Sequence, residues 1–263
     1  MASFSCRLCG SDNLKLYYCQ GNRNQFKHYK CSNCRLVNYD LSAGLDQCQY
    51  TDLSVDPSND RLNSNRGQDQ SYYFLKKHIK VRGYLIDIGC GNGRLLNNAR
   101  KDGWLVKGLD LSPEWVDFVK KKLEIDVEVA NFLEFEAKQI EPCDVVVLRH
   151  VLEHLPDSIK ALNKIKIMLK QNGYSLLEFP NIEGFDKRLK RFLENTGLKH
   201  RKYSEDFIPG HCNEFCKESF SFLLKKTGFK LIKWETYSLK PIGNYIYNHI
   251  HIGNKARALI QKI

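Results

Sequence analysis

One stretch of this 263-residue chain decides the fold, and it reads Tyr84-Leu85-Ile86-Asp87-Ile88-Gly89-Cys90-Gly91-Asn92-Gly93. The apolar residues before the first glycine are typical of a buried strand in a parallel sheet. A glycine-rich turn directly after such a strand brings the backbone close to a ligand and aims the amide groups of the next helix at it. The stretch therefore predicts a strand, a ligand-binding turn and a helix, in that order.

The chain from residue 71 onward continues this alternation of strands and helices. We expect strands at 84–88, 105–109, 127–130, 144–148, 174–179 and 230–236, and helices at 71–80, 94–102, 157–170, 185–195, 218–227 and from Pro113 onward. Such alternation predicts an α/β fold with a doubly wound, mostly parallel sheet. Residues 238–263 match no element clearly.

The spacing of the glycines indicates which ligand the turn binds. A dinucleotide-binding turn has a glycine at the sixth position of its pattern, where this chain has Arg94 when the count starts at Gly89. An arginine is too bulky for the close approach to a pyrophosphate. Asp110 follows 17 residues after Gly93, at the end of the second expected strand, where a carboxylate can accept both hydroxyls of a ribose. The pattern therefore argues against a dinucleotide.

Residues 85–93 closely resemble motif I of class I methyltransferases, which use S-adenosylmethionine, and the matching motifs cover about residues 84–180. The resemblance implies a Rossmann-like class I methyltransferase fold and S-adenosylmethionine as the cofactor. It places Asp87 and Gly89 at the methionine part of the cofactor and Asp110 at the ribose. The full set of implied cofactor-binding residues is Asp87, Gly89, Cys90, Gly91, Gly93, Asp110, Leu111, Asn131, Phe132 and Arg149.

The adenine end of the expected site departs from the family pattern. Asn131 stands after the third strand, where the family usually has an acidic residue. Its side-chain carbonyl oxygen can still accept a hydrogen bond from the adenine amino group, and Phe132 lies beside it for the ring.

A set of cysteines near the start of the chain predicts a metal site. Two Cys-x-x-Cys pairs, Cys6 with Cys9 and Cys31 with Cys34, are separated by 21 residues. Four thiolates at this spacing suit tetrahedral Zn²⁺ and close its coordination sphere, so the site is expected to be structural. We expect residues 1–40 to form a zinc-ribbon module, 41–70 a connector or lid, and 71–263 the methyltransferase domain, with a basic helical insertion at about 183–210.

Two histidines are candidates for removing a proton from the methyl acceptor. His154 follows the fourth expected strand, and His211 lies on the loop before the helix at 218–227. Both match positions in zinc-ribbon methyltransferases that act on nucleotide-linked sugars or belong to surface-polysaccharide clusters, which the Cys6-to-Ser11 opening also resembles. Ile208 and Gly210 stand where the sugar C-methyltransferases of this group have Tyr and Glu, so methylation of a sugar oxygen or nitrogen is expected instead.

Two other functions remain open at this point. Some enzymes that methylate ribosomal RNA also join a zinc ribbon to this fold, and a net charge of +11 suits contacts with phosphates. The chain lacks their Asn-Pro-Pro-Tyr type motif after the fourth strand, where it has Arg149-His150-Val151-Leu152. A zinc-ribbon binding protein with an inactive methyltransferase domain is the other alternative.

The bulk properties limit the partners and the compartment. No segment has the roughly 20 apolar residues of a membrane-spanning helix, and the first residues lack the features of a signal peptide, so we expect a cytoplasmic protein. The expected partner is a small molecule or saccharide, and nucleic acid is the less favoured one. The basic segment at 185–202 and the C-terminal tail could contact an anionic membrane surface where lipid-linked sugars are assembled.

Overall fold

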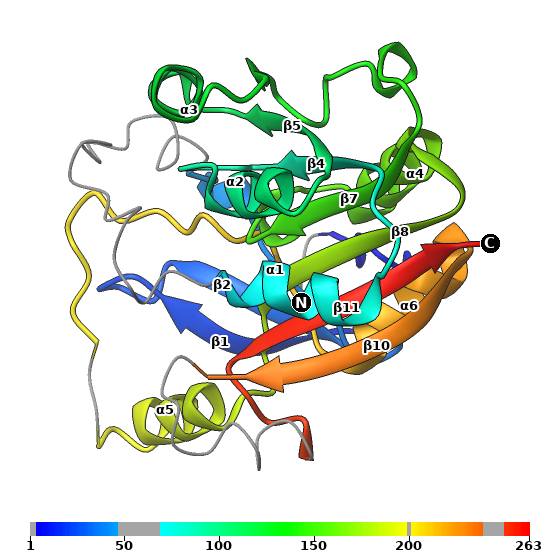
Figure 1. The fold of residues 1–263 in the computed structure, drawn as a ribbon. Coiled ribbons are helices and arrows are strands. Elements are labelled where there is room, and N and C mark those ends of the chain that lie inside the picture. Colours follow the sequence, from blue (N-terminus) through cyan, green and yellow to red (C-terminus); the bar gives the residue numbers. More distant parts are fainter. Residues whose placement is uncertain (1–3, 47–68, 199–200, 239–249) are drawn as a thin grey trace.

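A computed structural model describes residues 4–46, 69–198, 201–238 and 250–263 of the chain (Figure 1). Its centre is a seven-stranded sheet with the strand order β10-β11-β8-β7-β4-β5-β6. These strands are β4 (Tyr84–Ile88), β5 (Leu105–Asp110), β6 (Val127–Val129), β7 (Cys143–Arg149), β8 (Leu169–Pro180), β10 (Phe229–Tyr237) and β11 (Lys255–Lys262). Strands β4 to β8 pair in parallel, and β11 pairs antiparallel with both β8 and β10. The expected Rossmann-like fold with a mostly parallel sheet is confirmed.

Helices cover both faces of this sheet, as a doubly wound fold requires. The helices are α1 (Gln70–His78), α2 (Arg94–Lys101), α3 (Pro113–Leu123), α4 (Ser158–Met168), α5 (Phe185–Asn195) and α6 (Lys217–Thr227), with short 3-10 helices η1 (Leu41–Ala43), η4 (Ala137–Gln139) and η5 (Leu152–His154). Buried side chains of α1, α2 and α3 form one core, whereas those of α4 and α6 belong to the other.

Alternation along the strands divides the side chains between these two cores. Val145 and Val147 of β7 lie in the core with α2, while Val146 and Leu148 lie in the core with α4. Because successive side chains of a strand point to opposite faces, a strand that is buried on both sides must be apolar throughout. This requirement explains why β7 was recognisable from its run of apolar residues.

The segment that the sequence left unassigned contains a strand inside the central sheet. Figure 1 shows β11, in red, between β8 and the orange β10. Since β11 runs antiparallel to its neighbours, its first residues lie at the edge where the parallel strands end. Lys255 pairs with Pro180 and Arg257 with Glu178 in this register. The antiparallel strand therefore brings two basic residues to the edge that carries the glycine-rich turn.

A second sheet joins the N-terminal segment to a distant part of the chain. Strands β1 (Leu14–Gln20), β2 (Phe26–Cys31), β3 (Val37–Tyr39) and β9 (Asn213–Glu214) pair antiparallel in the order β1-β2-β3-β9. β9 begins two residues after His211. The N-terminal segment thus forms one sheet with the loop that carries a candidate catalytic histidine.

Some expectations fall on residues that the structure does not describe. Residues 47–68 of the expected connector and residues 239–249 of the tail lie outside the described ranges. Among the helices that are described, none combines the length and the apolar character that crossing a bilayer requires.

Candidate functional site

The glycine-rich turn connects β4 to α2 through backbone conformations that favour glycine. Gly89 has φ +70°, and a Cβ atom there would lie 2.5 Å from Cγ2 of Val151. Gly91 has φ +50° with no atom within 4 Å of such a Cβ, so its backbone faces open space. The amide of Gly89 donates to the carbonyl oxygen of Leu109 at 2.7 Å, which ties the turn to the end of β5. The turn therefore presents bare backbone toward a ligand.

Asp110 holds the turn from the neighbouring strand. Its carboxylate accepts the Gly91 amide at 2.7 Å and the Ser112 amide at 2.9 Å. Burial raises the pKa of Asp110, although these amide hydrogen bonds act in the opposite direction. Leu111, the next residue, has a side chain that is 37% exposed. A carboxylate that is held in place as a hydrogen-bond acceptor, beside an exposed apolar side chain, suits a nucleoside ligand.

Asp87 is a buried carboxylate at the base of the turn. It is fully buried, and neither of its oxygens accepts a hydrogen bond from any residue that the structure describes. Its nearest cation is Arg149, whose guanidinium lies 3.5 Å from one oxygen and donates to Asp69 at 2.7 Å. Burial raises the pKa of Asp87 to about 7. A carboxylate in this state favours a ligand that donates hydrogen bonds or carries positive charge.

The two residues expected at the adenine lie on the far side of the turn. The Asn131 side chain is exposed and accepts the amide of Leu133 at 3.1 Å. Phe132 is 5% exposed within the core on the α4 side, and Nζ of Lys164 lies 5.6 Å from its ring centroid.

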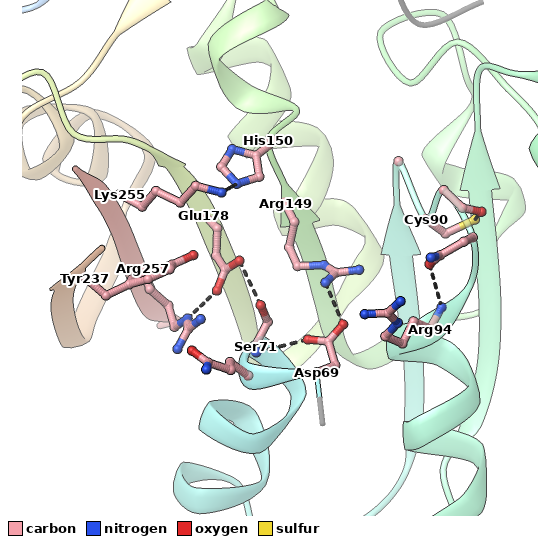
Figure 2. Close-up of a pocket in the computed structure, with 14 residues that line it drawn as sticks. Asp69, Ser71, Cys90, Arg94, Arg149, His150, Glu178, Tyr237, Lys255 and Arg257 are labelled. Carbon is pink, nitrogen blue, oxygen red and sulfur yellow. Dashed lines mark hydrogen bonds and ion pairs between the residues drawn. The ribbon is translucent and has the colours of Figure 1, made fainter. Parts of the chain in front are cut away.

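A cavity of about 440 Å³ lies next to the turn, between the ends of the strands and the start of α1 (Figure 2). It is lined by Asp69, Gln70, Ser71, Gly89, Cys90, Gly91, Asn92, Arg94, Arg149, His150, Glu178, Tyr237, Lys255 and Arg257. The cavity brings together Gly89, Cys90, Gly91 and Arg149 of the predicted set. The thiol of Cys90 packs in the core on the α2 side, so only the backbone of this residue suits a ligand.

Several lining residues were not predicted, and they form a charged network. Asp69 caps α1 by accepting the amides of Ser71 and Tyr72. Glu178 accepts the Ser71 hydroxyl at 2.8 Å and is bound by the guanidinium of Arg257. Figure 2 shows these contacts side by side. The sequence signal for Asp69 was weak, because it follows a stretch with no regular pattern.

His150 is a further residue that sequence reasoning did not select. Its backbone is left-handed, with φ +57°, and its amide donates to the carbonyl oxygen of Glu178 at 2.8 Å. Its Nδ1 lies 3.3 Å from Glu153, and its Nε2 lies 3.0 Å from Nζ of Lys255. Burial lowers the pKa of Lys255. His150 thus connects a buried carboxylate to an amine on the cavity wall.

The two predicted histidines lie together and are not among the residues that line the cavity. The ring centroids of His154 and His211 are 4.6 Å apart at an interplanar angle of 74°. Glu153 has a ligand atom within 4.8 Å of both rings, and His154 Nδ1 lies 2.8 Å from the carbonyl oxygen of Gly210. Burial lowers the pKa of His211, which favours the neutral form of its ring. Burial alone would raise the pKa of Glu153, but its hydrogen bond with His150 and the neighbouring histidines lower it.

The four predicted metal ligands also come together. The sulfur atoms of Cys6, Cys9, Cys31 and Cys34 all lie within 4.8 Å of one another. The Cys6 and Cys34 sulfurs are 3.5 Å apart, as are those of Cys9 and Cys31. A group of four mutually close thiols has the donor chemistry and number that a tetrahedral Zn²⁺ site needs.

The sheet order, the single antiparallel strand and the Gly-rich turn define the class as a Rossmann-like methyltransferase fold. A family model described as "Methyltransferase domain" matches residues 60–233, and the chain belongs to this family. Solved structures agree on the fold. The chain is similar to a SAM-dependent methyltransferase from Archaeoglobus fulgidus, with TM-score 0.54 and 19% identity, over 75% of this chain and 96% of that one.

Curated relatives match at low identity. The chain is 27% identical over 105 residues to the ubiquinone biosynthesis O-methyltransferase of Coxiella burnetii, which covers 38% of this chain and 45% of the relative. It is 26% identical over 187 residues to the ubiquinone/menaquinone biosynthesis C-methyltransferase of Campylobacter jejuni, which covers 63% and 76%. The match thus spans less than half the length of the first of these relatives.

Proposed function

We propose that this protein transfers a methyl group from S-adenosylmethionine to an oxygen or nitrogen of a sugar. The sugar would belong to a nucleotide-linked or lipid-linked saccharide of surface polysaccharide biosynthesis. The observation that carries the cofactor assignment is a turn whose bare backbone lines a cavity, with the buried Asp87 carboxylate at its base and Asp110 bound to the amide of Gly91. Membership of the methyltransferase domain family supports the same reaction.

The residues around the turn suit the parts of this cofactor. Asp110 would accept the ribose hydroxyls, with Leu111 and Asn131 toward the adenine, and Asp87 would favour the positively charged methionine end. When bound, the cofactor supplies an electrophilic methyl group. The protein then has to align the acceptor atom with that group and remove its proton.

Proton removal is the task of the histidines in this proposal. Burial favours the neutral form of His211 by lowering its pKa, and buried Glu153 lies close enough to stabilise the charge that a histidine gains when it takes a proton. A sugar hydroxyl is a weak nucleophile, so a base of this kind is needed. The relative from Coxiella burnetii is also named as an O-methyltransferase, which supports transfer to oxygen.

The N-terminal cysteines and α5 extend the proposal. Zn²⁺ bound by Cys6, Cys9, Cys31 and Cys34 would hold together the loop before β1 and the loop after β2, which suits a segment with few apolar residues.

α5 exposes Phe185, Leu189 and Phe192 and is proposed to contact an anionic membrane surface.

The cofactor assignment predicts a specific loss of affinity. Replacing Asp110 by Ala should weaken the binding of S-adenosylhomocysteine by at least about tenfold, because two hydrogen bonds to a charged group are lost. Isothermal titration calorimetry measures this change. Asp117→Ala, an exposed carboxylate on α3, is the matched control and should bind as the wild type does. The cofactor assignment fails if the wild type gives no binding heat.

A further inference from the structure

The loop that carries His211 lies between two parts of the molecule. On one side, the Cys212 amide donates to the carbonyl oxygen of Glu153 at 2.9 Å, and Nδ2 of Asn213 donates to that of Leu155 at 2.7 Å. On the other side, the Tyr39 amide donates to the carbonyl oxygen of Cys212 at 3.0 Å. The loop is therefore held by the methyltransferase sheet and by the N-terminal sheet together.

Arg7 makes a further link on the N-terminal side. It lies between Cys6 and Cys9, and its guanidinium is half-buried against the loop. Its Nε donates to the side-chain oxygen of Asn213 at 3.2 Å, its Nη1 to the carbonyl oxygen of Tyr39 at 2.9 Å, and its Nη2 to that of Cys212. Hydrogen bonds from a charged group are stronger than those between neutral groups. The Arg7 side chain, from the loop between Cys6 and Cys9, thus binds the residues directly after His211.

Asn38 connects this link to a thiol of the metal site. Its Oδ1 accepts the Arg7 amide at 3.1 Å, and its Nδ2 lies 3.5 Å from the sulfur of Cys6. Residues that contact both a ligand and a neighbouring loop fix the orientation of each. A continuous chain of contacts therefore runs from Cys6 through Asn38 and Arg7 to Cys212.

We propose that Arg7 is a positioning residue that makes the placement of His211 depend on a metal-filled cysteine site. The inference rests on the proposed function only in giving His211 its role at the acceptor. With the four thiolates bound to Zn²⁺, the loop from Cys6 to Cys9 is closed and Arg7 is held against Cys212. Without the metal, this loop is released and the His211 loop loses its N-terminal support.

The test compares two arginines that both lie next to the cysteines. Arg7→Met should speed amide hydrogen exchange at residues 212–214 by about tenfold or more, since charge-assisted hydrogen bonds are lost. Arg35→Met is the matched control: Arg35 follows Cys34, is 49% exposed and binds Glu183 instead of the loop. It should leave exchange at 212–214 unchanged. Removing Zn²⁺ from the wild type with a chelator should reproduce the effect of Arg7→Met.

Further measurements separate this inference from the metal and cofactor assignments. Elemental analysis should give one zinc per chain in the wild type and both variants, and S-adenosylhomocysteine should bind all three equally. The ring resonances of His211 should shift in Arg7→Met only, and Arg7→Lys should restore part of the wild-type exchange rate. Unchanged exchange in zinc-loaded Arg7→Met overturns the proposal. Wild-type protein that binds no zinc, or Arg7→Met that loses its zinc while exchange at 212–214 stays slow, also overturns it.

Discussion

The surroundings of Asp87 disfavour the ionised form of its carboxylate. It is fully buried, accepts no hydrogen bond from the described residues, and has a pKa of about 7. An unfolded chain gives the same group a pKa near 3.8. Between these two values the folded protein binds more protons than the unfolded one, so stability falls as the pH rises through this window. The cofactor-free protein therefore carries a cost at neutral pH that a cationic ligand can relieve.

The variant Asp87→Asn should remove this pH dependence. Below pH 4 it should be no more stable than the wild type, whereas at pH 8 the cofactor-free variant should be more stable, by at most about 4 kcal/mol at 1.36 kcal/mol per pKa unit. Urea unfolding at several pH values measures the difference. Wild-type stability that increases from pH 5 to pH 8 more than that of the variant would contradict this account of Asp87.

Sequence and structure agree on single residues where a local pattern sets the position. Asp87, Gly89 and Asp110 follow from the strand and the turn, because each lies a fixed number of residues from a strand end. His150 does not, since its contact with Lys255 depends on the pairing of β11. Arg7 does not either, because its contacts are with a loop about 200 residues away in the sequence.

At the scale of elements, α5 has its charged side turned inward. Lys187 lies 3.6 Å from buried Glu214, and the guanidinium of Arg191 lies 4.7 Å from the ring centroid of Tyr17. The outward side shows Phe185, Leu189 and Phe192, which are 50%, 45% and 61% exposed. Arg188 is exposed beside them, so this side of the helix combines apolar side chains with a positive charge, while Lys190 is paired with Glu194. This combination complements anionic lipid headgroups.

The membrane proposal predicts a defined effect of one substitution. Leu189→Glu should reduce co-sedimentation with vesicles that contain phosphatidylglycerol by about tenfold or more, because a charge replaces an exposed apolar side chain that would enter the lipid interface. Val81→Glu, at a residue that is 79% exposed on the loop before β4, adds the same charge elsewhere and should bind as the wild type does. If the wild-type protein does not co-sediment with these vesicles, the membrane proposal is wrong. A dimer that Leu189→Glu dissociates would assign the surface to a second copy of the chain.

Elements could be predicted where the chain alone determines them. β4, β7 and the second half of β8 have apolar runs that two covered faces require. β11 reads Lys-Ala-Arg-Ala-Leu-Ile-Gln-Lys, whose residues suit a helix as well, and only pairing on both sides makes it a strand. β9 has two residues, too few for any pattern.

At the scale of the whole molecule, a net charge of +11 favours a methyl acceptor that is negatively charged. Lys255 lines the cavity with its Nζ 3.0 Å from the His150 ring, and an acceptor that carries a phosphate or carboxylate would complement this amine. Transfer of a labelled methyl group to a nucleotide-linked sugar should depend on Lys255, and Lys255→Met should raise KM by about tenfold. Lys233→Met, on β10, is the control. Methylation of RNA in place of any sugar would favour the RNA enzyme.

The place of β11 also determines the order in which a growing chain can fold on the ribosome. β10 has no partner in the central sheet until residues 255–262 have been made, because β11 lies between it and β8. The glycine-rich turn, β4 and β5 are by then complete. The nascent protein can therefore form the cofactor half of its site early, while the basic wall with Lys255 and Arg257 closes last. Until that moment β8 has an unpaired strand edge, and such an edge favours aggregation of newly made chains.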